Sequence, residues 1–460
     1  MRLAIAAPGP AGYPFVGVFP MARRDPLGFF LSCARRYGNV VSMRLGVHHV
    51  YLLHHPDHVK QVLQDHARAY AKRPSASRVR ALFGDSLTVV DGDRWRQRRR
   101  LVQPAFLPGQ HVQFSAVTTR ATEEMLERWR LRAERGEPVE IVSEMRRLTQ
   151  TIIIRALFGE VPDAETRALG EALDLAVAHV ERRMWSPLGW LEVPASGGAA
   201  YQRALGAVNA FVTRRLAEAR RTSPAAGTLL AALVAAPPVE SRDPLSEAEL
   251  RDECKALLVA GHTTTASALA WTWYVLSRHP AARERVEQEC RALPVDHARG
   301  GADLHRLDYT RRVIDEVLRL YPPTWLTART PVEDDAIGGY TIPAGALLLL
   351  SPYVTHRDPD FWDEPERFDP DRFTSARVAA RPAFAYFPFG GGPRRCVGSG
   401  VAAAEMHSIV AQVAQRFRLD LLPGAHVTAT AGLTLRPHPA VPMRLHLAPP
   451  GSDGSVSRDQ

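Results

Sequence analysis

One stretch of the chain, between Ser246 and His279, has the pattern of a single very long helix. It begins with capping-box spacing at Ser246 and Glu249 and ends before a proline. At 1.5 Å per residue it would span about 50 Å, well beyond the usual helix length. Its middle, residues 260–265, reads Ala-Gly-His-Thr-Thr-Thr, which combines a glycine with residues of poor helix propensity. Residues of poor helix propensity at the centre of a long helix indicate function. Close packing at the glycine, and hydrogen bonds from the threonines to helix carbonyls, would also explain them.

The rest of the chain reads mainly as helix, with short strands near both ends. Strand patterns cover 40–45 and 49–53, then 340–342 and 347–351, and each pair is predicted to form a hairpin. A length of 460 residues suggests roughly three domains, but no fixed-period repeat or long Gly/Ser linker divides the chain. The predicted fold class is therefore mainly α with small β-sheets, as one domain over 1–448 followed by a disordered tail over 449–460.

Charge and composition disfavour several classes of protein. The formal net charge is +9, but the basic residues are spread along the chain and no zinc-finger, RNA-recognition or basic-zipper pattern occurs, so we expect no nucleic acid partner. No stretch is long and apolar enough to be a transmembrane segment, and the N-terminal apolar run is too short for a signal peptide. The four cysteines are too few for a disulfide framework, which predicts free thiols and a cytoplasmic location.

The loop from Phe387 to Gly398 places Cys396 at a glycine-rich entry to a helical pattern over about 401–417. Amide donors and the positive end of the helix dipole would favour the thiolate, which is the form that ligates metal. Glycines at 390–392 would let the backbone approach something flat and large, and Arg394 offers a cation to an anionic group. We therefore expect Cys396 to be functional and the other three cysteines to be small buried apolar residues.

With these features the sequence resembles the cytochrome P450 family of haem-thiolate monooxygenases. The family's haem-binding signature, Phe-x-x-Gly-x-Arg-x-Cys-x-Gly, is matched by Phe389, Gly392, Arg394, Cys396 and Gly398. Weaker signals follow in family order and extend the resemblance over nearly the whole chain: Trp95-x-x-x-Arg99, Ala260-Gly261-x-x-Thr264-Thr265, Glu316-x-x-Arg319, Arg329 after Leu-Tyr-Pro-Pro, and the Pro-Glu-Arg-Phe segment that contains Arg367.

The resemblance implies a haem b cofactor (iron protoporphyrin IX) with the Cys396 thiolate as axial ligand, held in the signature loop by Phe389 and Gly398, and O₂ as co-substrate. Arg99, Arg329 and Arg394 are then expected to pair with the two propionates, with Trp95 donating a hydrogen bond to one of them. Such pairing is needed because carboxylates in an apolar pocket are costly unless paired.

The resemblance also implies roles on the two faces of the haem. Gly261 and Thr264 are expected to form the oxygen-binding groove, where the Thr264 hydroxyl would hold O₂ or its water while protons arrive. Glu316, Arg319 and Arg367 are expected to form a paired structural network that holds the cysteine loop in place.

Thr263 departs from the family pattern, which has an acid at this position. A hydroxyl can pass protons along a water chain but cannot hold a negative charge. We therefore predict slower or leakier oxygen activation, with protons supplied through water or a substrate hydroxyl. His262 could replace the acid as a base, but a packing histidine that points away from the groove is the favoured interpretation.

The activity implied is insertion of one oxygen atom from O₂ into a lipophilic small molecule. The resemblance fills the chain, so NAD(P)H electrons would arrive through an external reductase and a ferredoxin or flavodoxin, docked on the arginines of 94–100, 394–395, 416 and 418. Two alternatives stay open. One is a peroxide-driven peroxygenase or isomerase, which the missing acid favours, and the other is a non-enzymatic haem-binding sensor.

Substrate-lining positions are predicted from the family pattern alone, and each could equally belong to the ordinary core. They are apolar and aromatic, which suits a terpenoid, a fatty acyl chain or a polyketide. The run from Tyr321 to Leu326 is similar to bacterial terpene oxidases, which favours a terpenoid. The predicted lining residues are Leu82, Phe83, Leu87, Met184, Trp185, Trp190, Thr324, Trp325 and Leu326.

Overall fold

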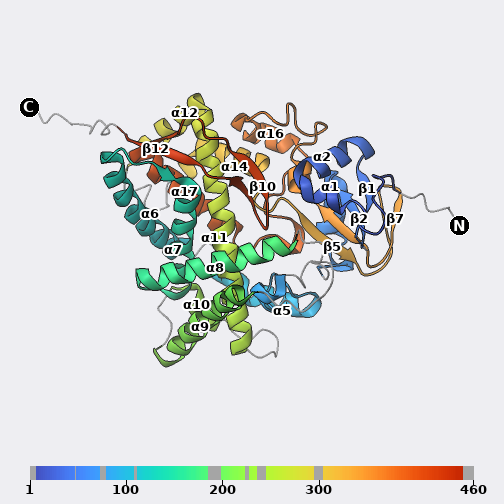
Figure 1. The fold of residues 1–460 in the computed structure, drawn as a ribbon, viewed down its shortest axis with the longest axis horizontal. Coiled ribbons are helices and arrows are strands. Elements are labelled where there is room, and N and C mark those ends of the chain that lie inside the picture. Colours follow the sequence, from blue (N-terminus) through green and yellow to red (C-terminus); the bar gives the residue numbers. More distant parts are fainter. Residues whose placement is uncertain are drawn as a thin grey trace, which may run out of the picture.

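The computed structural model describes residues 7–46, 48–72, 79–107, 111–184, 198–222, 227–235, 245–294 and 304–448. Most of these residues are helical (Figure 1). The helices are α1 (Phe19–Arg24), α2 (Pro26–Tyr37), α3 (Pro56–Lys60), α5 (Gly92–Val102), α6 (His111–Glu134), α7 (Ile141–Phe158), α8 (Asp163–Met184), α9 (Ala199–Thr222), α10 (Leu229–Val234), α11 (Glu247–Arg278), α12 (Pro280–Arg291), α14 (Asp308–Leu320), α15 (Pro352–Thr355), α16 (Ser375–Ala380) and α17 (Ser399–Arg416).

The strands form small sheets, and β11 packs against the central helix α11. One sheet has the order β1-β2-β8-β5-β3, another has the order β4-β12-β9, and β10 pairs with β11 and β6 with β7. The strands are β1 (Val40–Leu45), β2 (His48–Leu53), β3 (Tyr70–Ala71), β4 (Val139–Glu140), β5 (Thr327–Pro331), β6 (Asp335–Ile337), β7 (Tyr340–Ile342), β8 (Leu347–Leu350), β9 (Phe417–Leu421), β10 (Thr428–Ala431), β11 (Leu435–His438) and β12 (Pro442–Leu447).

The first predicted hairpin is confirmed and the second is wrong. Strands β1 and β2 pair antiparallel, with Val40 opposite Leu53. In contrast, β7 pairs with β6, while β8 lies between β2 and β5 in a different sheet. Strand β8 consists of four leucines and is buried. A strand with neighbours on both edges and both faces covered needs such a continuous apolar run, so the turn at 343–345 leads from one sheet into the middle of another.

Helix α11 runs through the centre of the molecule (Figure 1). Its N-cap is Ser246, whose side chain forms the predicted capping box with Glu249, and His279 is its C-cap. The first half of α11 packs into one large apolar cluster with α7, α8 and α9, and its second half packs into another with α6, α12, α14 and α17. The middle of the helix, which contains the residues of poor helix propensity, therefore lies at the junction of the two main parts of the core.

The tail predicted over 449–460 lies outside the described residues. Among the helices that the structure describes, none has the length and apolar character needed to cross a membrane.

Candidate functional site

The loop before α17 folds tightly around Cys396. The Cys396 amide donates to the carbonyl of Phe389 at 2.9 Å, which closes the loop just ahead of α17. Gly392 has a φ of +62°, and a Cβ there would lie 1.8 Å from the carbonyl oxygen of Leu63. Only glycine fits both the left-handed backbone and this close approach. The loop is therefore built so that the cysteine side chain is presented at a helix start.

The Cys396 thiol is exposed, whereas the other three cysteines are buried. The dense protein around it nevertheless raises its pKa, through desolvation, and the amide of Gly398 and the cations Arg99, Arg395 and Lys72 oppose this shift without overcoming it. The amide of Gly398 therefore favours the thiolate, as expected, but burial outweighs its effect in the free side chain. A bound metal cation would supply the missing stabilisation, because a coordinating thiol is deprotonated outright.

A buried ion pair beneath the loop joins Glu316 and Arg319 of α14. Both side chains are fully buried, and the guanidinium donates to the two carboxylate oxygens at 2.6 and 2.8 Å. Arg319 also donates to the carbonyls of His356, Pro365 and Arg367 at 2.7–3.1 Å. The pair therefore holds a length of irregular backbone in place, as the sequence predicted for these two residues.

His356 connects this network to the cysteine loop. Burial lowers the pKa of His356 well below its usual value, so the ring is neutral. Its Nδ1 lies 3.2 Å from the carbonyl oxygen of Arg319, and its Nε2 lies 3.0 Å from the amide of Phe387. A neutral ring that donates through Nδ1 and accepts through Nε2 satisfies both contacts. The loop that carries Cys396 is thus hydrogen-bonded to the α14 network through one histidine.

The side chain of Arg367 does not join the network, so that prediction is wrong. It is exposed and pairs with Glu364 at 2.7 Å, and only its backbone carbonyl reaches Arg319. Arg372 occupies the place expected for it, with its Nε 3.5 Å from Glu316, and the amide of Asp369 donates to the same carboxylate. The linear motif showed that this segment meets the pair but not which of its arginines turns inward.

Two predicted cations, Arg394 and Arg329, lie near the cysteine loop together with a third, Lys72, that no motif indicated. Arg394 pairs with the Asp91 carboxylate and lies 4.4 Å from the centre of the Trp95 ring. Burial and the neighbouring Arg394 lower the pKa of Arg329 to about 10. Lys72 is the additional cation, and burial together with Arg329 and Arg394 lowers its pKa to about 7. Asp91 opposes the shift in each of these three groups.

Arg99 contacts the loop directly: it donates to the carbonyl of Arg395 at 2.8 Å and to the side chain of Gln103 at 3.0 Å. Lys72 gave no motif signal because it is an isolated residue before a stretch with no pattern. Asp91 was recognisable only as a residue preceding a helix.

The donor set fits a haem. Burial is the main cause of the lowered pKa values of Lys72 and Arg329, and the neighbouring arginines add to it; two carboxylates placed here would offset both effects. The cysteine faces an accessible space, and Gly398 beside it has no neighbour closer than 3.6 Å to the position of a Cβ. An accessible thiol, nearby cations and clearance beside the sulfur therefore occur together, as a macrocycle with an axial cysteine and two propionates requires.

The middle of α11 shows both threonine hydrogen bonds to helix carbonyls and close packing at the glycine. The hydroxyls of Thr263 and Thr264 donate to the carbonyls of Val259 and Ala260 at 3.0 and 2.8 Å. A Cβ on Gly261 would come within 2.8 Å of Ile153, so the glycine is needed for close packing of α7 on α11. Ala260 remains exposed although its helix neighbours on both sides are largely buried. The role of Gly261 and Thr264 in an oxygen groove stays a prediction.

His262 is fully buried, with its Nδ1 2.6 Å from the carbonyl oxygen of Leu258. Its Nε2 lies 3.9 Å from the carboxylate of Asp174 on α8. The ring therefore fills the contact between α8 and α11, in agreement with a packing histidine.

The predicted lining residues are distributed between the core and the surface of the site. Leu82 and Phe83 are buried in the cluster formed with α7 to α11, and Leu87 packs on its edge together with Leu257 and Val397. The Trp325 indole donates to the carbonyl of Gly432 and packs in a separate cluster with α2 and β1, which agrees with the ordinary core that was the other interpretation of this residue. Leu326 packs on the edge of that cluster, and Thr324 is exposed. Met184 ends α8 half-buried, and Trp185 and Trp190 lie outside the described residues.

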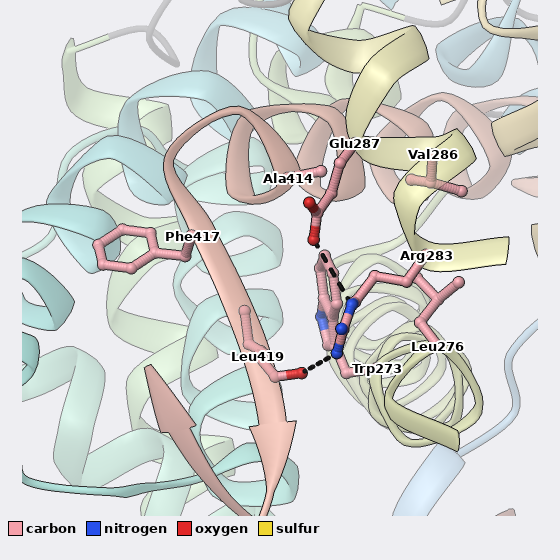
Figure 2. Close-up of a pocket in the computed structure, with 8 residues that line it drawn as sticks. All are labelled: Trp273, Leu276, Arg283, Val286, Glu287, Ala414, Phe417 and Leu419. Carbon is pink, nitrogen blue, oxygen red and sulfur yellow. Dashed lines mark hydrogen bonds and ion pairs between the residues drawn. The ribbon is translucent and has the colours of Figure 1, made fainter. Parts of the chain in front are cut away.

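A small cavity lies at the other end of α11 from its capping box. Figure 2 shows Arg283 and Glu287 of α12 meeting beside Trp273, with Phe417 and Leu419 of β9 nearby. Its volume of about 10 Å³ is close to the space that one water molecule needs. None of the predicted site residues lines it, so this cavity is not a substrate site.

Comparisons with known proteins agree with this geometry. The sequence model of the family described as Cytochrome P450 matches residues 7–443. Cyclooctatin synthase of Streptomyces melanosporofaciens is 35% identical over 94% of this chain and 93% of the relative. Cyclooctat-9-en-7-ol 5-monooxygenase of the same organism is 34% identical over 90% of each chain, and pentalenene oxygenase of Streptomyces avermitilis is 28% identical over 97% and 98%.

Solved structures show the same fold. The haem domain of cytochrome P450DA matches with a TM-score of 0.86 at 26% identity, over 98% of this chain and 99% of that one. The retinoic acid bound cyanobacterial CYP120A1 matches with a TM-score of 0.85 at 27% identity, over 97% and 100%. The fold is thus the single-domain P450 haem fold, mainly helical with small sheets.

The chain belongs to the cytochrome P450 family. It is a P450 monooxygenase, of the class that carries haem on a cysteine thiolate and uses O₂, and the relatives named above place it among enzymes of secondary metabolism.

Proposed function

We propose that the protein inserts one oxygen atom into a terpenoid, with electrons from NAD(P)H delivered by a separate reductase through a ferredoxin or flavodoxin. The observation that carries the enzymatic part is the exposed Cys396 thiol in a loop whose Arg394 lies close to two further cations, Arg329 and Lys72. The terpenoid rests on the relatives, because cyclooctatin synthase and pentalenene oxygenase are both named for terpenoids. The free cysteines agree with a cytoplasmic location.

Each side chain of the site has a proposed task. Cys396 would bind the iron, and Arg99, Arg329, Arg394 and Lys72 would hold the two propionates. When bound, the haem supplies oxygen activation and the oxidation of a C–H bond. Thr264 would rotate its hydroxyl from the Ala260 carbonyl toward the site, where it would hold a water and orient its proton. Thr263 would leave the groove without a carboxylate, so that protons pass through water or a substrate hydroxyl.

The electron donor would dock near the cysteine loop. Arg100 and Arg395 are exposed, and the hydrogen bond from Arg99 to the Arg395 carbonyl joins α5 to the loop. Arg94 and Arg96 are also exposed but pair with Asp85 and Asp93, which weakens their attraction for an acidic partner. We therefore expect an acidic protein donor, whose association weakens as salt rises.

The test uses the haem-loaded protein with cyclooctat-9-en-7-ol and pentalenene as probes. Isotopically labelled O₂ with ferredoxin, its reductase and NADPH is compared with unlabelled hydrogen peroxide alone. We expect a product with one labelled oxygen only in the reductase reaction. Product from peroxide alone would favour the peroxygenase, and haem binding without any product would favour the sensor. A spin-state shift with fatty acids but with neither terpenoid would contradict the proposed substrate class.

Replacing Thr263 with glutamate is expected to raise the fraction of electrons that ends in product. The new carboxylate restores a group that takes up and releases protons, and the yield should rise by up to about 100-fold, the lower end of what a positioned acid contributes. The measurement is product formed per NADPH consumed. Thr263→Gln is the matched control, since it has the same shape without an ionisable proton. Equal coupling in all three proteins would show that the departure from the family pattern is neutral.

A further inference from the structure

The segment Gly84–Asp91 crosses from α11 to the cysteine loop, and both of its ends are hydrogen-bonded. At the α11 end, the amide of Asp85 donates to Asp252 and the amide of Leu87 donates to Glu253, each at 2.8 Å. These are backbone donors of an irregular segment, which needs partners because it has none within a helix or sheet. Two consecutive carboxylates of α11 thus bind the segment through its main chain.

Glu253 is a shared partner at this contact. It is only 1% exposed, and its Oε1 accepts both the Leu87 amide and Arg98 of α5 at 3.0 Å. Arg98 is 2% exposed and donates its other nitrogen to Glu249 at 2.8 Å. A carboxylate that loses its hydration on burial needs charged and hydrogen-bonding partners. Here the partners come from two separate parts of the chain.

The segment is shaped to lie against these carboxylates. Gly84 has a φ of +59°, and a Cβ at this position would lie 2.1 Å from the Asp252 carboxyl carbon. Asp252 is in turn fixed by Lys255 at 2.9 Å. A side chain at position 84 would therefore push the segment off α11.

The other end of the segment carries the groups that hold the cations of the site. The carbonyl of Val90 accepts from Arg394 at 3.2 Å, and the Asp91 carboxylate pairs with the same guanidinium. Asp91 also accepts the amide of Lys72 at 2.9 Å, and the carbonyl of Thr88 accepts its ammonium at 3.3 Å. The position of the segment consequently determines the position of two cations near Cys396.

We propose that Gly84–Asp91 is a strap between α11 and the cysteine loop, and that Glu253 is the positioning residue that fixes it. Glu253 acts at a distance: it holds Leu87, the strap carries Asp91 and Val90, and these hold Arg394 and Lys72 in place for the propionates. The inference rests on the proposed haem site and adds a residue that acts through the strap, because its carboxylate accepts from Leu87 and Arg98.

The test compares Glu253→Ala, Glu253→Gln and Glu249→Gln in the haem-loaded protein. Glu253→Ala removes the acceptor of the Leu87 amide, whereas Glu253→Gln keeps an oxygen acceptor there. Glu249→Gln is the matched control, because it weakens the same arginine without touching the strap. We expect faster hydrogen exchange at residues 85–90 and about tenfold faster haem transfer to apomyoglobin in Glu253→Ala, the lower end of what supporting residues around a metal site contribute. Glu253→Gln should restore much of both, and Glu249→Gln should resemble the wild type.

Gly84→Ala provides a second variant if Glu253→Ala fails to fold. It leaves the Glu253–Arg98 pair intact but forces the strap away from Asp252, so it should also speed haem release. Wild-type exchange and haem release in both Glu253→Ala and Gly84→Ala would overturn the strap. A wild-type protein without a thiolate-ligated haem spectrum would instead refute the haem site, which separates the two failures.

Discussion

Replacing Cys396 with serine is expected to abolish thiolate ligation and to lower product formation at least about 100-fold, because the thiolate is the ligand that makes haem iron favour O–O cleavage. The serine hydroxyl is a far weaker ligand and does not ionise near neutral pH. The thiol is the exposed cysteine of the chain and lies at the start of α17, so the substitution changes no packed core. The measurement is the thiolate-specific absorption band of the reduced carbon monoxide complex, followed by product formation.

Cys33→Ala is the matched control for this experiment. Cys33 is buried in the cluster around α2 and β1, away from the cysteine loop. It should keep the thiolate-specific band and the activity. If Cys396→Ser retained that band, a different cysteine would be the ligand and the assignment of the site would be wrong.

Replacing Arg319 with alanine is expected to lower the free energy of unfolding by about 3–5 kcal/mol, because it leaves the Glu316 carboxylate buried without its cation. Glu316 and Arg319 are both fully buried, and the guanidinium also serves three backbone carbonyls. Haem content should fall as well, because the His356 ring is hydrogen-bonded both to the Arg319 carbonyl and to the amide of Phe387 in the cysteine loop. Denaturant unfolding and the ratio of haem to protein measure the two effects.

Arg367→Ala distinguishes the observed network from the one that the sequence predicted. The Arg367 side chain pairs with Glu364 on the surface, and its contribution to Arg319 is a backbone carbonyl that alanine retains. We therefore expect stability and haem content close to wild type. Loss of haem in Arg367→Ala would contradict the observed geometry, whereas Arg372→Ala should be the more damaging change because its guanidinium lies near Glu316.

Local chemistry made part of the site predictable. The signature around Cys396 is contiguous, and its glycines are required by backbone geometry that a sequence pattern records directly, as at Gly392. The pairing of Glu316 with Arg319 follows from helix periodicity, since residues three apart share a face. The capping box of α11 is likewise a relation between neighbouring residues.

Contacts between distant segments were not predictable in this way. Lys72, Asp91 and Arg394 meet only because three separate loops converge, and nothing in the sequence around Lys72 marks it. Trp325 lies in a motif next to the site but turns into another core cluster, and Arg367 turns to the surface while Arg372 turns inward. The β7–β8 hairpin failed for the same reason, because strand partners are selected by burial in a sheet and not by the turn between them.

The family, the mainly helical class, the exposed cysteine and the buried ion pair could all be predicted from the amino-acid sequence, because each depends on residues close together in the chain. The folded structure was needed to identify the cations near the cysteine loop, the arginine that completes the network, and the Gly84–Asp91 strap between α11 and that loop. These features depend on which side chains are buried and on the charges that surround the site. Residues far apart in the chain contribute to both.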